Sequence, residues 1–465
     1  MLFNSNEFLV FFALFCTAYV LVRNSLAARN RLIVVASYVF YGSWDYRFAG
    51  LLLLTSGLDF TLARLIEGTG TDRRRRALLA ASVGLNLGVL ALFKYFNFFR
   101  ESLEGLLSTW GVESHWKGWQ IVLPIGISFY TFQSMSYVVD VYRRRMPASR
   151  DLIQFLAYVS FFPQLVAGPI ERGTHLLPQF NRPLPIRAAD LEAGVWLIIW
   201  GLFKKVVLAD NLAPLVELVY QHAAPAGPMV VLGTIAFALQ IYCDFSGYSD
   251  IACGLARLFG FNLMLNFNLP YLATSLRDFW RRWHISLSTW LRDYLYVPLG
   301  GSRGGEGRTY LNLGITMLLG GLWHGAALTF LLWGLWHGLG LMANRWWEQR
   351  GFGRKLPSWS GWLVTQALVL YGWLLFRANS LDQVLQMTRA LTDWSVPRWW
   401  GAYLTNLVVL ASPLLAMQAW QWRSGKLDAP LTLPLWARAG LQATLLLTIM
   451  AFWAPEASPF IYFQF

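Results

Sequence analysis

The chain alternates long apolar runs with short polar segments along its whole length. The runs cover residues 7–22, 32–65, 77–99, 121–142, 152–170, 191–213, 229–256, 310–342, 361–376, 402–420 and 436–454. A helix needs about 20 mostly apolar residues to cross the hydrocarbon core of a bilayer. The runs do not alternate as barrel strands do, and the backbone inside a bilayer must satisfy its own hydrogen bonds. We therefore expect an all-α polytopic membrane protein with about ten to twelve spans, forming a single domain over residues 1–465.

Three of the runs do not fit one simple crossing each. Residues 32–65 and 310–342 are long enough for two short spans, or for one span with a re-entrant piece. Residues 152–170 have basic residues on both sides and contain Pro163 and Pro169, which break helices. A re-entrant hairpin is the better prediction there. Non-helical backbone at membrane depth is tolerated where it lines a cavity, so we expect an internal cavity or tunnel.

Composition supports a membrane protein. Hydrophobic residues make up 56% of the chain and charged residues 14%, whereas soluble domains carry about 25% charged residues. The net charge of +13 is explained by basic cytoplasmic loops, and no aromatic–basic platform for nucleic acid is present. The three cysteines, Cys16, Cys243 and Cys253, lack metal-ligand spacing, so we expect neither a disulfide framework nor a bound metal.

The basic clusters also predict an orientation. Residues 23–31, 73–76 and 143–145 are rich in arginine and are expected in the cytoplasm, which places the N-terminus outside. The segment 101–120 would then be an external loop. No Lys or Arg precedes the first apolar run, so we interpret this run as a true span and not as a cleavable signal.

Residues 240–345 differ in character from the rest of the chain. Arginines, tryptophans and a histidine interleave from residue 277 to residue 296, and Asp278 is spaced to pair with Arg281 and Arg282 on a helix. The segment suits an interfacial helix at the mouth of a cavity. The glycine-rich turn at 299–305 suits a phosphorylated ligand or, equally, lipid headgroups.

Two histidines follow in this segment. His324 lies within an apolar run beside Gly320, Gly321 and Gly325. A neutral imidazole there suits general base catalysis, although a histidine in a span can also simply hydrogen-bond a neighbouring helix. His337 repeats the Trp-His-Gly pattern 13 residues later. On a continuous helix its side chain would point nearly the opposite way, so we interpret His337 as structural.

Four motifs lie in this segment: YCDFSGYSD (242–250), NFNLPY (266–271), FWRRWHISLSTWLRDYLYVPLGG (279–301) and TMLLGGLWHG (316–325). Together they resemble the motifs of the membrane-bound O-acyltransferase family, closest to its bacterial alginate O-acetyltransferase branch. The likeness extends to the start of the chain and to the closing FIYFQF (460–465), so it covers most of the sequence.

The resemblance implies a ring of helices around a funnel that narrows to a tunnel. It implies that His324 matches the family's invariant histidine and His284 its second polar residue, both catalytic. It further implies a bacterial inner-membrane enzyme that takes acetyl-CoA or another cytoplasmic acyl thioester as co-substrate, with no permanently bound cofactor. The acceptor would be a periplasmic SGNH-like partner protein or an exported, alginate-like polysaccharide. Residues expected to help bind the donor are Arg281, Arg282, Trp283, Trp323, Asp244 and Asn312.

Several alternatives stay open. The acceptor could be teichoic acid, peptidoglycan, lipid or protein instead of an exopolysaccharide. His284 could orient the acyl group, donate to the oxyanion or hand on a proton, and a covalent acyl-histidine is a second route. A transporter of polymeric or lipid-linked saccharide would share the buried polar residues and broken helices. A non-catalytic scaffold would tolerate loss of His324.

Overall fold

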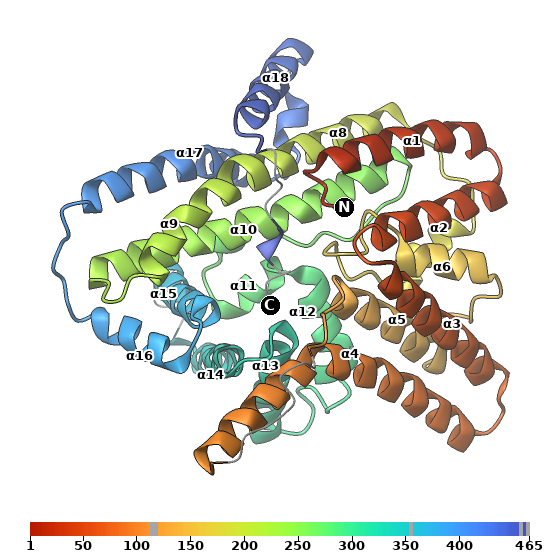
Figure 1. The fold of residues 1–465 in the computed structure, drawn as a ribbon, viewed down its shortest axis with the longest axis horizontal. Helices are drawn as coiled ribbons and strands as arrows, with labels where there is room; N and C mark the ends of the chain where they lie inside the picture. Colours follow the sequence, from red (N-terminus) through yellow and green to blue (C-terminus); the bar gives the residue numbers. More distant parts are fainter. Residues whose placement is uncertain (112–119, 353–356, 455–458, 462–465) are drawn as a thin grey trace. The chain divides into compact units, whose positions relative to one another are not determined.

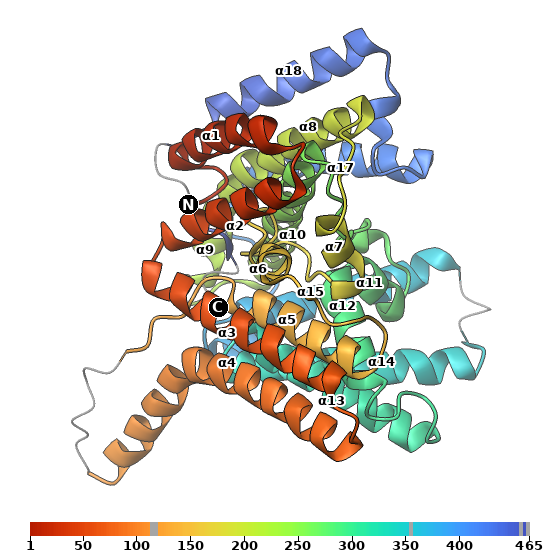
Figure 2. The ribbon, with the colours of Figure 1, turned by 90° about the vertical axis from the view of Figure 1, so that its right-hand side faces the viewer.

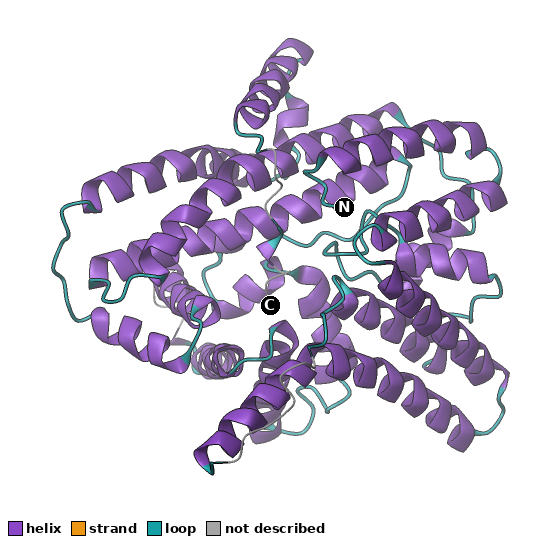
Figure 3. Ribbon diagram, viewed as in Figure 1, coloured by secondary structure: helices purple, strands orange, loops and turns teal. Residues whose placement is uncertain are grey.

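Every regular element of the computed structural model is helical (Figure 3). The structure describes residues 1–111, 120–352, 357–454 and 459–461, and no strand occurs within those ranges. The chain divides into two compact units. Unit 1 holds Met1–Leu191 with Leu255–Met264, and unit 2 holds Glu192–Gly254 with Leu265–Phe465.

Unit 1 contains seven helices within its described residues (Figure 1). They are α1 (Asn6–Val22), α2 (Leu26–Gly42), α3 (Tyr46–Gly68), α4 (Asp72–Thr109), α5 (Ile127–Tyr142), α6 (Leu152–Ser160) and α7 (Gly173–Phe180). Side chains of Ser5, Ser25 and Asp45 cap the first three by accepting hydrogen bonds from backbone N–H groups of the first turn. The run at 32–65 is thus divided between two helices, α2 and α3, and of these α3 is long and apolar enough to cross a membrane.

Helices α3, α4 and α5 pack against one another, and both ribbon views show them side by side (Figures 1 and 2). Helix α4 continues to Thr109, so the expected loop from Glu101 is wrong for its first part. Residues 112–119 of that loop lie outside the described residues.

The segment 152–170 has the broken form expected from its prolines. Helix α6 is nine residues long, which is too short to cross a bilayer. The non-helical backbone from residue 161 to residue 172 is buried throughout. Gly168 turns so closely that an added Cβ would lie 2.6 Å from the Cα of Gln164, and the N–H of Phe162 donates to Ser37 Oγ at 3.0 Å.

Unit 2 holds the remaining elements, apart from the first residues of the helix at Ala188–Leu202 and the last residues of the helix at Gly227–Leu258, which belong to unit 1. They are α8 (Ala188–Leu202, which starts in unit 1), η1 (Phe203–Ala209), α9 (Asp210–Tyr220), α10 (Gly227–Leu258), η2 (Pro270–Leu272), α11 (Leu276–Arg282), α12 (Ile285–Leu291), η3 (Arg292–Tyr296), α13 (Glu306–His324), α14 (Leu328–Gln349), α15 (Ser358–Arg377), α16 (Leu381–Ala390), α17 (Trp400–Ser424), η5 (Ala429–Thr432) and α18 (Leu435–Ala451). The run at 310–342 is therefore also two helices, α13 and α14, which pack against each other.

Glycines allow α8 to approach α10 closely. A Cβ on Gly201 would lie 2.6 Å from the carbonyl oxygen of Gly247, and one on Gly254 would lie 2.7 Å from that of Gly194. The two contacts are seven residues apart on each helix, as expected for antiparallel helices meeting along one face. Small residues of this kind let membrane helices pack backbone to backbone.

Five helices are long and apolar enough to cross a membrane, counting the described residues alone. They are α3, α4, α10, α15 and α17, while α1 and α18 are shorter apolar helices. The chain is accordingly an all-helical polytopic membrane protein. The larger count of ten to twelve spans stays a prediction.

Candidate active site

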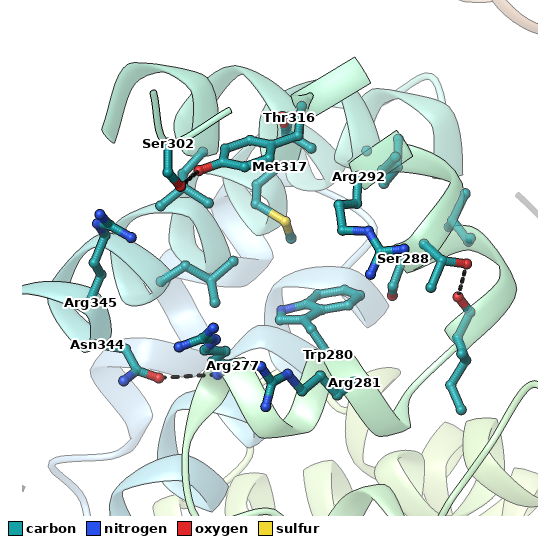
Figure 4. Close-up of a pocket in the computed structure, with 18 of the residues that line it drawn as sticks. Arg277, Trp280, Arg281, Ser288, Arg292, Ser302, Thr316, Met317, Asn344 and Arg345 are labelled. Carbon is teal, nitrogen blue, oxygen red and sulfur yellow. Dashed lines mark hydrogen bonds between the residues drawn. The ribbon is translucent and has the colours of Figure 1, made fainter. Parts of the chain in front are cut away.

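A cavity of about 490 Å³ lies in unit 2 among α11, α12, η3, α13 and α14. Its lining includes four arginines and one glutamate: Arg277, Arg281, Arg292, Arg345 and Glu348. Figure 4 shows Arg277, Arg281 and Arg292 near the ring of Trp280, and Arg345 at the left of the view beside Asn344. Apolar side chains, uncharged polar side chains such as Ser288, Ser302 and Thr316, and His324 complete the wall. The cavity therefore combines positive charge with an imidazole.

His324 is the last residue of α13. The helix stops there because Gly325 adopts an extended backbone, and a Cβ at this glycine would overlap the ring of Phe330. The residue is 5% exposed, and its ring is framed by aromatic rings, with Trp333 at 5.0 Å and Phe376 at 5.4 Å between ring centroids. His324 is thus buried in protein, yet it lines the cavity.

His284 lies at a break in the backbone between α11 and α12. Its φ of 44° is in the left-handed region, which side chains other than glycine rarely adopt. We expected one interfacial helix through this segment. A continuous helix is wrong, because the segment forms two seven-residue helices that meet at Trp283 and His284. Strain at a buried histidine points to a function that depends on its position.

Asn266 fixes the orientation of the His284 ring. Its Oδ1 lies 3.1 Å from His284 Nδ1 and accepts from the backbone N–H of Ser286 at 3.3 Å. A backbone N–H can only donate, so the atom facing it is the oxygen of the amide. That oxygen requires a proton on Nδ1, which leaves the lone pair of neutral His284 on Nε2. Asn266 belongs to the NFNLPY motif, but sequence reasoning missed its role.

Trp323 links the two predicted catalytic histidines. Its ring centroid lies 4.9 Å from that of His324 and 6.1 Å from that of His284. Phe245 lies on α10 within the YCDFSGYSD motif. Its ring packs edge-on against that of His284, with the ring centroids 4.6 Å apart. Three of the predicted site residues, His324, His284 and Trp323, thus lie close together in the structure.

His337 is closer to this cluster than the sequence led us to expect. The expected continuous helix from His324 to His337 is wrong, because α13 ends at His324 and α14 begins at Leu328. Trp333 lies between the two rings, 5.0 Å from His324 and 4.9 Å from His337. The structural role of His337 stays a prediction.

The other residues predicted to bind the donor differ in whether they line the cavity. Arg281 lines the cavity. Arg282 does not line it and pairs with Asp278 at 2.9 Å, the i+4 contact expected from the spacing. Trp283 is 1% exposed and packs between Phe279 and Trp373, at 5.7 and 4.8 Å.

Asn312 supports the glycine-rich turn from within α13. Its Nδ2 donates to the carbonyl of Gly301 at 2.9 Å, and the side chain is buried. Gly300 and Gly301 have φ values of 114° and 58°, which glycine tolerates. Ser302, in the same turn, lines the cavity and bonds Tyr296 at 2.8 Å. Asn312 therefore shapes the turn without lining the cavity.

Asp244 belongs to a buried ionic network. Its carboxylate lies 2.8 Å from Lys205 Nζ and accepts from the N–H of Ile461 at 2.6 Å. Lys205 also pairs with Asp210 at 2.8 Å, while its neighbour Lys204 pairs with Asp250 at 2.7 Å. Both lysines are buried in η1, a π-helical segment, and such segments often mark functional sites. Sequence reasoning missed both lysines, although a Lys pair inside an apolar run was a visible signal.

The network also holds the end of the chain. Phe460, the first residue of the FIYFQF motif, packs against Phe245 at 5.7 Å and Tyr248 at 5.1 Å. Phe245 in turn contacts His284. The C-terminal segment therefore supports the helix that packs against His284; residues 462–465 lie outside the described ranges.

Comparison with known proteins agrees with the motifs. The sequence model of the membrane-bound O-acyltransferase family matches residues 142–381. The chain is 41% identical to a probable alginate O-acetylase AlgI of Azotobacter vinelandii, over 90% of this chain and 83% of the relative. It is 40% identical to the protein of that name in Pseudomonas putida, over the full length of both. A peptidoglycan O-acetyltransferase of Helicobacter pylori is 35% identical over 82% of this chain and 76% of the relative. The chain, in which His324 lines an arginine-rich cavity, therefore belongs to the membrane-bound O-acyltransferase family of enzymes.

Proposed function

We propose that this O-acyltransferase moves an acetyl group from a cytoplasmic acyl thioester, acetyl-CoA, to an acceptor on the periplasmic face of a bacterial inner membrane. The final acceptor is an alginate-like exopolysaccharide. The names of the relatives with the highest identity quoted above support this choice of acceptor. Coenzyme A cannot cross the bilayer, so the enzyme passes the acyl group between two aqueous compartments.

The observation that carries the proposal is the shared cavity of His324 and four arginines. Guanidinium groups bind phosphate through paired, charge-assisted hydrogen bonds. Acetyl-CoA carries three phosphates on one end and a thioester on the other. A cavity that offers arginines and an imidazole to one ligand suits both ends of that molecule.

The chemistry is acyl transfer with an imidazole base. His324 takes the proton of the acceptor hydroxyl as its oxygen forms a bond to the thioester carbonyl carbon. The tetrahedral intermediate then collapses, the carbon–sulfur bond breaks, and the leaving thiolate takes the proton from His324, which restores the neutral base. General base action of this kind is typically worth about 10²–10⁴-fold in rate.

His284 has a narrower set of roles once its tautomer is considered. With the proton on Nδ1, the neutral ring presents Nε2 as a proton acceptor. That favours a proton-relay role over donation to the oxyanion. A covalent acyl-histidine on either ring remains the second route.

The immediate acceptor is a periplasmic, SGNH-like partner protein that passes the acetyl group on to the polymer. The predicted external N-terminus belongs to the same orientation. Genes for a polysaccharide synthase and an SGNH-like protein beside this gene would agree with the assignment.

The test uses the purified full chain in nanodiscs with radiolabelled acetyl-CoA. Release of free coenzyme A thiol and label transfer to a hydroxyl acceptor are measured together. His324→Ala should abolish both, while His222→Ala, an exposed histidine outside the cavity, should leave both unchanged. Full activity of His324→Ala would remove the central assignment and favour a scaffold.

Alternative acceptors and functions give different results in the same assay. Label transfer to peptidoglycan fragments instead of polysaccharide would follow the Helicobacter pylori relative. Movement of saccharide across the bilayer without thiol release would instead indicate a transporter.

A further inference from the structure

Unit 1 contains a second cavity, of about 610 Å³, where the connection between α3 and α4 meets the end of α5. Three arginines line it: Arg75, Arg144 and Arg145. Its one lining carboxylate, Glu67, accepts a hydrogen bond from the N–H of Ala148 at 3.0 Å. The cavity therefore carries an excess of positive charge.

Arg144 occupies a position where a glycine is the usual residue. The N–H of Arg145 donates to the carbonyl of Asp140 at 2.9 Å, and the N–H of Arg144 donates to that of Val141 at 3.0 Å. This pair of bonds is the Schellman motif, which ends many helices. The residue of the motif that adopts the left-handed conformation is Arg144. Arg144 has a φ of 59°, so the chain accepts backbone strain to keep an arginine there. Strain that is retained at one residue points to a function for its side chain.

The other two arginines are held in place by the fold. Arg75, in the first turn of α4, is buried, donates to the carbonyl of Tyr142 at 2.6 Å and lies over the ring of that tyrosine at 5.5 Å. Arg145 lies 3.4 Å from Asp140. The three side chains come from two segments that are far apart in sequence and converge on one space. Such preorganisation lowers the entropy lost when a ligand binds.

We propose that this cavity binds a phosphate-bearing ligand from the cytoplasm, presented either by the headgroup of an anionic phospholipid or by a soluble phosphate ester. Guanidinium groups match phosphate oxygens in pairs, and basic clusters beside membrane spans attract anionic lipid. Both arginine-bearing segments belong to clusters predicted to lie in the cytoplasm. The site shares no lining residue with the acyl-transfer cavity and does not depend on the proposed reaction.

The test measures the melting temperature of the full chain in phosphatidylcholine nanodiscs, with two added probes. One arm includes phosphatidylglycerol in the disc, and native mass spectrometry counts the lipid retained. The other arm adds sn-glycerol 3-phosphate to the buffer. A rise in melting temperature in the first arm supports the lipid source, and a rise in the second supports the soluble source. No rise in either arm overturns the proposal.

Variants distinguish binding of the probe in this cavity from a general attraction of anions to the basic surface. Arg144→Gln removes the charge and keeps the strained backbone, so we expect binding about tenfold weaker. Arg74→Gln is the matched control, because it removes one charge from an exposed neighbour that does not line the cavity. Arg144→Gly should raise the melting temperature of the ligand-free protein while weakening the response to the probe. The proposal would be overturned if Arg144→Gln and Arg74→Gln weakened probe binding equally, or if Arg144→Gln did not weaken it at all.

Discussion

Nδ1 of His284 lies 3.1 Å from Oδ1 of Asn266, and this contact determines which nitrogen of the ring can take up a proton. The same oxygen accepts from Ser286 through both its N–H and its hydroxyl, at 3.3 and 2.9 Å. Asn266 in turn donates to Ser249 at 3.2 Å. The histidine is therefore oriented by a chain of hydrogen bonds that extends to Ser249 in α10.

Removing this orientation should slow the reaction. Asn266→Ala lets the ring adopt either tautomer, and we expect kcat to fall about 10- to 100-fold, which corresponds to about 1.4–2.8 kcal/mol of transition-state stabilisation. Acetyl transfer from labelled acetyl-CoA measures the effect. Ser286→Ala is the control, since it removes one bond to Asn266 and leaves the contact with the ring. Equal losses in both variants would mean that Asn266 only stabilises the fold.

Arg281 and Arg282 are neighbours in sequence with different surroundings, and they should differ in their effect on the donor. Arg281 lines the cavity, whereas Arg282 is occupied by Asp278. We expect Arg281→Gln to raise the KM for acetyl-CoA about tenfold with little change in kcat, because a charge-assisted hydrogen bond to phosphate is lost. Arg282→Gln should change the KM much less. An unchanged KM in Arg281→Gln would place the donor elsewhere.

The apolar runs predicted the helices well, because lipid and protein interior both select apolar side chains over a length set by the bilayer. The splits within 32–65 and 310–342 could be expected from length alone, although their positions could not. The break at His284 could not be predicted, because a histidine with positive φ has no sequence signature. It is held by Asn266, a contact that exists only after folding.

His284 and His324 could be singled out from their motifs as candidate catalytic residues, but their environment could not be predicted. The pairing of Lys205 with Asp244 joins residues on separate helices, and neither spacing nor composition reports such a contact. The same limit applies to Trp323, whose place between His284 and His324 depends on how α13 packs.

The buried pair of Lys205 and Asp244 should be necessary for stability. Lys205→Met leaves the buried carboxylate of Asp244, and that of Asp210, without a counter-charge, and breaking a buried pair typically costs about 3–5 kcal/mol. We expect a large drop in melting temperature in detergent, whereas Lys426→Met, at an exposed lysine, should have little effect. Adding Asp244→Asn to Lys205→Met should recover part of the loss, because asparagine can still accept from the N–H of Ile461. A double variant no more stable than the single one would contradict this account.

The glycine contact between α8 and α10 gives a steric prediction. An alanine at Gly201 would place its Cβ 2.6 Å from the carbonyl oxygen of Gly247, so backbone must move. We expect Gly201→Ala to destabilise the protein by about 1–3 kcal/mol. Gly57, in α3, has open space where a Cβ would lie, with no atom within 4 Å. Gly57→Ala should therefore be neutral or stabilising by up to about 1 kcal/mol through helix propensity. Thermal unfolding of the two variants in one detergent compares them directly.

The last prediction concerns pH and a histidine in unit 1. His175 Nδ1 lies 2.7 Å from the buried carboxylate of Glu171, and this hydrogen bond raises the pKa of His175 above its ordinary value of 6.5, against an opposing effect of partial burial. A pKa that is higher in the folded state means that the folded protein binds the proton more tightly than the unfolded chain. The stabilisation is therefore complete below pH 6.5 and is lost as pH rises through the raised pKa. His175→Gln removes this titration, so the melting temperatures of wild type and variant should differ most at acid pH and converge in the alkaline range. A difference that stays constant with pH would show that the proton on His175 does not contribute to stability.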